Sequence, residues 1–96
     1  MILYIYVILN NEVKIMALYT YKTQGTCSKE IHFEVEDGII TSVKFLGGCP
    51  GNTLGVSTLC VGRTVEEVIK MLEGIKCGPR PTSCPDQLSK ALKQAL

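Results

Sequence analysis

Three segments in the first half of the chain alternate between apolar and polar residues, the pattern of half-buried β-strands. They are residues 17–22 (ALYTYK), 29–36 (KEIHFEVE) and 39–46 (IITSVKFL). Only Asp37 and Gly38 separate the last two segments, and this residue pair favours a tight turn. We therefore predict a β-hairpin preceded by one further strand.

The register of this hairpin follows from its apolar faces. Directly opposed residues of an antiparallel pair point to the same face, so odd-numbered residues of the two strands should oppose one another. A three-residue loop of residues 36–38, with Gly38 left-handed as a bulge, satisfies this condition. It places Val35 opposite Ile39.

The same register brings two cysteines to the open end of the hairpin. Cys27 falls opposite Gly47, and Cys49 follows two residues later in a glycine-containing loop, residues 47–52. Glycine adopts the backbone conformations that such a loop needs. We expect a helix over about residues 53–61 after this loop.

The second half of the chain carries the helical period. Thr64, followed three residues later by Glu67, is a capping box, and Gly74 is a typical helix-ending residue. Between them, apolar residues recur at helical spacing: Val65, Val68, Ile69 and Leu72. Ser83 and Pro85 mark the start of a last helix with the same spacing at Leu88, Ala91, Leu92 and Ala95.

Strands followed by helices are typical of an α+β domain. We predict an antiparallel sheet of about three strands, followed by three helices packed on one face. A chain of 96 residues is long enough for one such domain with a single hydrophobic core.

The first sixteen residues (MILYIYVILNNEVKIM) stand apart from this pattern. Their apolar run, residues 2–9, is eight residues long, whereas a membrane-spanning helix needs about 20. They also lack the basic start and the small-residue cleavage site of a secretory signal. We expect these residues to form an extra β-strand, or to be an upstream extension of a chain whose natural start is Met16. We therefore divide the chain into an N-terminal extension, residues 1–16, and a domain, residues 17–96.

Composition and charge exclude several classes of function. Apolar residues make up 46% and charged residues 20% of the chain, and the formal net charge is +1. Without a basic stripe we expect no direct nucleic-acid binding, and we expect no membrane association. Five cysteines, an odd number, without a secretory signal favour a reducing cytoplasm over a disulfide framework.

The cysteines are the main candidates for chemistry. Cys27, Cys49, Cys77 and Cys84 fall in predicted loops or at element ends, where together they would form a thiolate set suited to Zn²⁺ or an iron-sulfur cluster. No C-x-x-C pair is present, so four unrelated thiols are the alternative. Cys60 lies inside an apolar helical stretch, and we assign it to the core.

Other catalytic groups are few. The single histidine, His32, falls on the polar face of a strand and is expected to face solvent. Cysteine–histidine catalysis needs a base beside the thiol, and the sequence shows no clear candidate. We therefore assign no catalytic residue, and a thiol enzyme that uses Cys84 stays an alternative.

Residues 82–86 have the sequence TSCPD, the string that names the TSCPD domain family. The chain resembles that family also at residues 25–30 (GTCSKE), 43–52 (VKFLGGCPGN) and 75–78 (IKCG), so that the resemblance spans residues 19–96. The family is similar to a region near the C-terminus of vitamin-B12-dependent class II ribonucleotide reductases. Small members are often labelled ribonucleoside-diphosphate reductase, an oxidoreductase of DNA synthesis.

The length of the chain limits what this resemblance implies. Ribonucleotide reduction needs a large barrel with a radical cysteine, a reducing pair and a cobalamin site, which 96 residues are too few to form. The resemblance therefore implies an accessory or metal-binding module that works with a class II ribonucleotide reductase.

A second similarity covers the same span. The order of cysteines, hairpin, glycine-cysteine loop and helices is similar to that of the U-type (NifU-like) iron-sulfur scaffold proteins, which implies a NifU/SufE-like fold and iron-sulfur assembly proteins as alternative partners. In those scaffolds three cysteines hold the nascent cluster, and they match Cys27, Cys49 and Cys84. Lys29 stands where the scaffold has an aspartate, and Ser83 where it has a histidine. Cys77 adds a fourth thiolate, which suits a closed, stable site.

Overall fold

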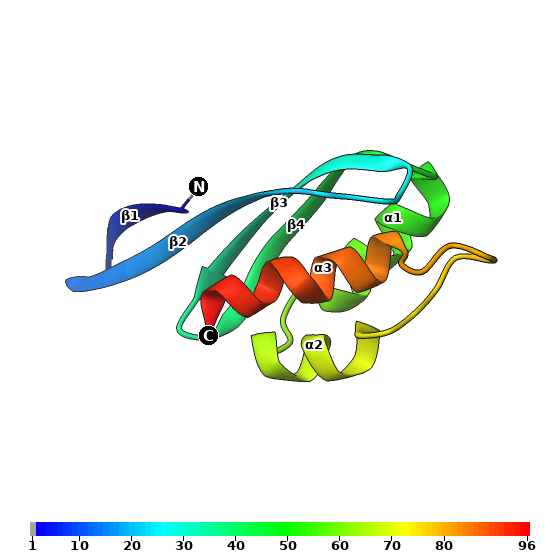
Figure 1. Ribbon diagram of the computed structural model, residues 1–96. Helices are drawn as coiled ribbons and strands as arrows, with labels where there is room; N and C mark the ends of the chain where they lie inside the picture. Colours follow the sequence, from blue (N-terminus) through cyan, green and yellow to red (C-terminus); the bar gives the residue numbers. More distant parts are fainter. Residues whose placement is uncertain (1) are drawn as a thin grey trace.

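An antiparallel sheet forms one layer of the molecule, and helices cover part of one of its faces (Figure 1). The computed structural model describes residues 2–96. The four strands lie in chain order across the sheet: β1 (Ile2–Leu9), β2 (Glu12–Lys22), β3 (Ser28–Glu36) and β4 (Ile39–Gly47). The helices are α1 (Pro50–Cys60), α2 (Val65–Leu72) and α3 (Cys84–Leu92), with a short 3-10 turn η1 (Lys93–Ala95). The predicted α+β class is confirmed, with four strands instead of about three.

The additional strand comes from the N-terminal residues. β1 pairs with β2 along its whole length, from Ile2 opposite Tyr19 to Leu9 opposite Glu12. β2 in turn pairs with β3 only from Met16 onward, so part of the β1–β2 hairpin projects beyond the rest of the sheet (Figure 1). The molecule is correspondingly elongated, 51 Å by 22 Å by 22 Å. The division at residue 16 stays a prediction, and it falls inside β2.

The turn between β3 and β4 differs from the prediction. Asp37 and Gly38 both have positive φ angles, 51° and 76°, and together they form a two-residue turn that matches the twist of the flanking strands. Val35 therefore lies opposite Ile40, not opposite Ile39. The predicted three-residue loop is wrong.

A bulge resolves the conflict between this turn and the apolar faces. The pairing skips Thr41, so that Glu34 opposes Ser42 and Phe33 opposes Val43. An extra residue in one strand reverses which of its side chains face the core. Ile40 before the bulge and Val43 after it therefore share the face that the helices cover, and odd-numbered residues oppose one another beyond this point, as predicted.

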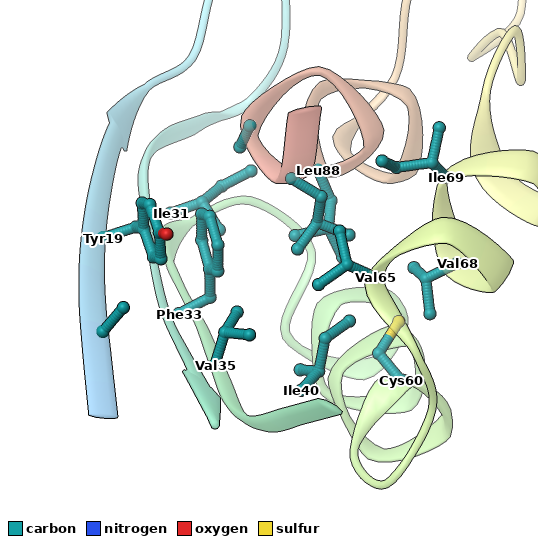
Figure 2. Close-up of a cluster of buried hydrophobic side chains, with 13 residues drawn as sticks. Tyr19, Ile31, Phe33, Val35, Ile40, Cys60, Val65, Val68, Ile69 and Leu88 are labelled. Atoms are coloured by element: carbon teal, nitrogen blue, oxygen red, sulfur yellow. The ribbon is translucent and has the colours of Figure 1, made fainter. Parts of the chain in front are cut away.

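The hydrophobic core fills the space between the sheet and the helices (Figure 2). The Phe33 ring stacks on the ring of Tyr19 at a centroid distance of 4.7 Å. The side chains that are fully or almost fully buried come from β3, β4, α2 and α3: Ile31, Phe33, Ile40, Val65, Val68, Leu88, Ala91 and Leu92. Cys60 at the end of α1 is 2% exposed and belongs to this cluster, so its predicted core position is confirmed.

The helix boundaries follow from local capping. The Thr64 hydroxyl accepts a hydrogen bond from the Glu67 amide, and the Ser83 hydroxyl accepts one from the Asp86 amide, as the sequence predicts. α1 begins earlier than predicted because Pro50 is suited to the first helical position. Within residues 2–96, no helix is both long enough and apolar enough to cross a membrane.

Candidate functional site

A pocket of about 300 Å³ opens at the end of the molecule where β3 begins and β4 ends. It is lined by residues of the β2–β3 loop, the start of α1, the α2–α3 loop and the start of α3. All four cysteines proposed as ligands line it: Cys27, Cys49, Cys77 and Cys84. These residues are up to 57 positions apart in the chain, and the fold brings them to one place.

Cys27 lies in the loop directly before β3, and its side chain is exposed. An irregularity in the β3–β4 pairing places Ser28, and not Cys27, opposite Gly47. The guanidinium of Arg80 donates a hydrogen bond from Nη1 to Cys27 Sγ at 3.4 Å. This contact joins the β2–β3 loop to the α2–α3 loop across the pocket.

Cys49 is the N-terminal flanking residue of α1, and it is also exposed. Its carbonyl oxygen accepts hydrogen bonds from the amide and the hydroxyl of Thr53, at 2.9 Å and 3.0 Å. Its side chain makes no capping hydrogen bond. The backbone of Cys49 is thus fixed to the helix while its sulfur stays available at the pocket wall.

Cys77 begins a small loop that is closed by its own backbone. The Cys77 amide donates to the Thr82 carbonyl at 3.2 Å, and the Cys77 carbonyl accepts from the Arg80 amide at 3.1 Å. Gly78 within the loop has a positive φ of 57°, a conformation that glycine adopts at little cost. The side chains of residues 73–81 are exposed, so only a few contacts hold this loop in place.

Cys84 differs from the other three because it is buried, with 9% exposure. It is the first residue of α3, and its thiol donates to the Ser28 hydroxyl at 3.3 Å. Ser28 Oγ also lies 3.0 Å from the hydroxyl of Thr26. A short hydroxyl–thiol network therefore connects the start of α3 to the start of β3.

Asp86 holds the start of α3 in position. Its carboxylate accepts hydrogen bonds from the Gly74 amide and the Thr82 hydroxyl and forms an ion pair with Lys90. Burial alone would raise the pKa of this carboxyl, but the hydrogen bonds and the charge of Lys90 outweigh burial and hold the pKa below its ordinary value. The carboxylate thus ties the end of α2, through Gly74, to the segment that carries Cys84.

The fit of these residues to a metal is good in donor type but not in spacing. Thiolates are preferred ligands of Zn²⁺ and of iron-sulfur clusters, with zinc–sulfur distances of about 2.3 Å. Within residues 2–96, however, no three side chains of cysteine, histidine, aspartate or glutamate are grouped closely enough to hold one metal ion. The four sulfurs line a common pocket without converging on a single point.

The charges around the pocket are of one sign. Lys76 and Arg80 line it, and no aspartate or glutamate does so among the described residues. Four thiolates around a divalent ion or an iron-sulfur cluster carry a net negative charge, which neighbouring cations stabilise. The charge distribution therefore suits an anionic group.

Two other sequence predictions concern residues outside the pocket. His32 is exposed, and its Nε2 lies 3.2 Å from a carboxylate oxygen of Glu30, so its predicted position on the solvent face is confirmed. Burial raises the pKa of the Cys60 thiol, against a smaller opposite effect of Arg63. Cys60 lies in the core and not in the pocket wall.

The sequence reasoning missed the hydroxyl residues around the cysteines. They are Thr26 and Ser28, which form the network with Cys84, and Thr82, whose hydroxyl donates to the Asp86 carboxylate. A signal was available, because Thr26 and Ser28 flank Cys27 directly and Thr82 lies two residues before Cys84. The contact between Ser28 and Cys84 joins residues 56 positions apart, so only the fold identifies it.

Comparison with known proteins gave one match. The model of the family described as the TSCPD domain matches residues 10–96. This span contains β2 and everything after it, including all four pocket cysteines, whereas β1 lies before it. No curated protein and no solved structure matched the chain significantly.

Proposed function

The chain belongs to the TSCPD domain family, and we propose that it is a metal-binding module in which Cys27, Cys49, Cys77 and Cys84 hold Zn²⁺ or an iron-sulfur cluster. The observation that supports this most is the shared pocket. Four of the five cysteines come from four separate segments, yet all four line one pocket, while the fifth is in the core. Unrelated thiols have no reason to gather in this way.

Closing the site requires a movement of the pocket walls, because the sulfurs do not yet form a compact set. Cys77 is best placed to move, since its exposed loop contains Gly78 and is held mainly by backbone hydrogen bonds within itself. Cys84 would exchange its hydrogen bond with Ser28 for the metal. Metal ligands must be deprotonated, so we expect binding to release protons and to weaken as the pH falls.

Arg80 has a defined role in this proposal. Its guanidinium already contacts Cys27 Sγ, and together with Lys76 it offsets the negative charge of the thiolates. It would remain beside the sulfur as an N–H donor when the site is filled, and such outer contacts tune the affinity of metal sites.

A link to ribonucleotide reduction forms the second part of the proposal. It rests on the resemblance of the family to a C-terminal region of vitamin-B12-dependent class II ribonucleotide reductases. In this view the module accompanies that enzyme in deoxyribonucleotide synthesis and does not itself carry out the reduction, since 96 residues cannot form the reductase barrel. The partner would be the reductase, in the cytoplasm.

The test begins with the metal content of the protein purified under anaerobic conditions. Metal analysis, acid-labile sulfide and the visible spectrum distinguish the outcomes. Zinc without colour supports a structural zinc site, and a brown protein with sulfide supports a cluster. Protein that contains neither, and that binds neither after reconstitution, contradicts the proposal.

Single substitutions then test the ligand set. We expect Cys27→Ser, Cys49→Ser, Cys77→Ser and Cys84→Ser each to lower metal retention at least about tenfold, because each removes one thiolate from the set. The matched control is Cys60→Ser, which lies outside the pocket and should retain the metal. Equal retention by all five variants would show that these sulfurs are not the ligands.

The alternative is an iron-sulfur scaffold with three ligands, Cys27, Cys49 and Cys84. The hydrogen bonds that the Cys77 backbone makes with Arg80 and Thr82 favour it, because they can stay intact if Cys77 is not a ligand. The scaffold predicts that Cys77→Ser retains the cluster and that the loaded protein transfers it to an apo acceptor. The four-ligand site predicts loss of the metal in that variant and no transfer.

A further inference from the structure

The hairpin of β1 and β2 carries an apolar surface that the described chain leaves uncovered. Even-numbered residues of β1 oppose odd-numbered residues of β2, so these side chains share one face of the sheet. We call this surface the ribbon face; its exposed members are Ile2, Tyr4, Tyr6, Ile8, Val13 and Ile15. It lies at the opposite end of β3 from the cysteine pocket.

The ribbon face continues the core face of the sheet. Ala17 opposes Val35, and Tyr19 opposes Phe33, and all four are buried beneath the helices. Further along the hairpin the cover ends (Figure 1). The exposed fraction of the side chains on β1 rises from 57% at Tyr4 to 69% at Tyr6 and 73% at Ile8. The sheet therefore presents a core-like surface where the helices no longer reach.

The size of this surface is comparable to one half of a protein interface. Aromatic side chains have about 150–250 Å² of surface, and aliphatic ones somewhat less, so the exposed fractions correspond to roughly 600 Å² of apolar area. The largest apolar patch of a typical monomer is about 300–600 Å². Each partner of a standard interface contributes about 800 Å². The ribbon face lies at the upper limit of the first range and below the second figure, and the ends of the helices beside it would add to the buried area.

The chemistry of the ribbon face makes it complementary to itself. The six exposed residues that form it, Ile2, Tyr4, Tyr6, Ile8, Val13 and Ile15, are all uncharged. Two identical apolar faces related by a twofold axis meet with no like charges opposed. Stacked sheets lie about 10 Å apart, so the ribbon of one copy would occupy the layer beside α3 of the other.

We infer that a second copy of this chain covers the ribbon face, by packing the two ribbon faces against each other about a twofold axis. The inference is independent of the metal proposal, because it concerns the other end of the sheet. It assigns a function to residues 2–9, which precede the residues that match the family.

Sedimentation velocity on the full chain tests this inference over about 1–100 μM, the range that resolves micromolar affinities. The wild-type protein should form a dimer that does not grow further. In the double variant Tyr6→Glu with Ile15→Lys, opposite charges replace two directly opposed apolar residues. Such a pair maintains the hairpin, but we expect the dimer dissociation constant to rise at least about a hundredfold because the face is no longer apolar.

The matched control is Leu3→Lys, which changes an exposed residue on the opposite face of β1 and should leave the dimer intact. A wild-type protein that stays monomeric throughout the range overturns the inference, and another protein or a lipid surface then becomes the expected occupant. Open-ended assembly, or equal loss of association in Leu3→Lys and the double variant, also overturns it, because both point to edge-to-edge pairing.

Fluorescence gives a second test that does not depend on the double variant remaining folded. The chain contains no tryptophan, so Tyr6→Trp and Leu3→Trp each introduce a single reporter on one face of β1. We expect the emission of the Tyr6→Trp protein to shift to shorter wavelength as its concentration rises, while that of Leu3→Trp stays constant. The reverse result, or no shift in either protein, contradicts the inference.

Discussion

The two ends of the sheet expose opposite kinds of chemistry on the same set of strands. At the end where β3 begins, loops and helix starts surround a pocket with thiols, hydroxyls and cations. At the other end, the β1–β2 hairpin extends past the helices with an exposed apolar face. One end is built from long-range contacts between side chains, and the other from local strand pairing.

This contrast shows how differently the two ends depend on the rest of the molecule. The pocket exists only if α3, the β2–β3 loop and the α2–α3 loop keep their relative positions, for which the Asp86 and Ser28 contacts are needed. The hairpin is held by the pairing of β1 with β2, by the pairing of β2 with β3 from Met16 onward, and by the stacking of Tyr19 on Phe33. Substitutions should therefore have large effects on stability in the core and at the buried contacts that support the pocket, and small effects on the ribbon face.

The largest effect is expected where the two ends meet the common core. Phe33 is 1% exposed and stacks on Tyr19. Phe33→Ala should lower the free energy of unfolding by about 3–5 kcal/mol, because it leaves a cavity and removes the contact that joins β2 to the core. Urea unfolding followed by circular dichroism measures this, and a loss below about 1 kcal/mol would show that the junction contributes little.

The second largest effect on stability is expected at Asp86, which supports the pocket, and it should depend on pH. Asp86→Asn removes the charge that Lys90 and two hydrogen bonds stabilise, and it should cost about 2–3 kcal/mol at pH 7. Because the pKa of Asp86 in the folded protein is depressed, this stabilisation is present above the ordinary value of 3.8 and is lost as the pH falls through the lower folded value. The difference between the wild type and the variant should therefore shrink in acid.

The control for this prediction is Glu66→Gln, which removes an exposed carboxylate from the first turn of α2. It should change the stability at pH 7 by less than about 0.5 kcal/mol. Urea unfolding at several pH values tests both variants. A difference between the wild type and Asp86→Asn that stays constant down to pH values well below the ordinary pKa would contradict the assigned cause.

A smaller effect on stability is expected at Cys60, and it should distinguish this core thiol from the thiols of the pocket. Cys60→Ser places a hydroxyl in an apolar site and should cost about 1–2 kcal/mol in metal-free protein. Cys49→Ser, at an exposed position, should change the stability of the same metal-free protein very little. Thermal unfolding in the presence of a chelator measures the stability of both variants. Equal losses of stability would argue against a buried environment for Cys60 and an exposed one for Cys49.

The smallest effect is expected on the ribbon face of the monomer. Ile8→Thr changes a side chain that is 73% exposed, and it should alter the stability at low protein concentration by less than about 0.5 kcal/mol. Threonine preserves the β-branched shape that strands favour. Urea unfolding below the concentration of dimer formation measures this, and a large loss would show that the ribbon face is covered within the monomer.

The site could be predicted from the sequence only in part. The positions of the four cysteines in loops and at element ends follow from the strand and helix patterns, and all four do line one pocket. The contact between Arg80 and Cys27 and that between Cys84 and Ser28 could not be predicted, because each joins residues more than 50 positions apart. Such contacts depend on how the helices and loops pack against the sheet. The periodicity of apolar residues does not predict this packing.

The fold shows the same division at the β3–β4 hairpin. The sequence correctly indicated two strands with apolar faces, but it favoured a three-residue loop because that loop aligns the faces without irregularity. The chain instead combines a two-residue turn with a bulge at Thr41. The two solutions agree on the faces of Val43 and Phe45 and differ in which isoleucine, Ile39 or Ile40, faces the core. The sequence does not distinguish two adjacent isoleucines, whereas the structure buries Ile40 completely.

The sequence by itself determined the α+β class, the helix caps at Thr64 and Ser83, the burial of Cys60 and the membership in the TSCPD family, because these depend on local patterns and on motifs. The sequence also offered an extra N-terminal strand as one of two alternatives, and the tertiary structure decided for it and showed that it extends past the helices with β2. The tertiary structure alone decided that the turn is followed by a bulge and that hydroxyls and an arginine lie beside the cysteines. The physical reason is that helix caps and side-chain periodicity depend on residues that are neighbours in the chain. The surroundings of a site depend instead on how distant segments pack against one another.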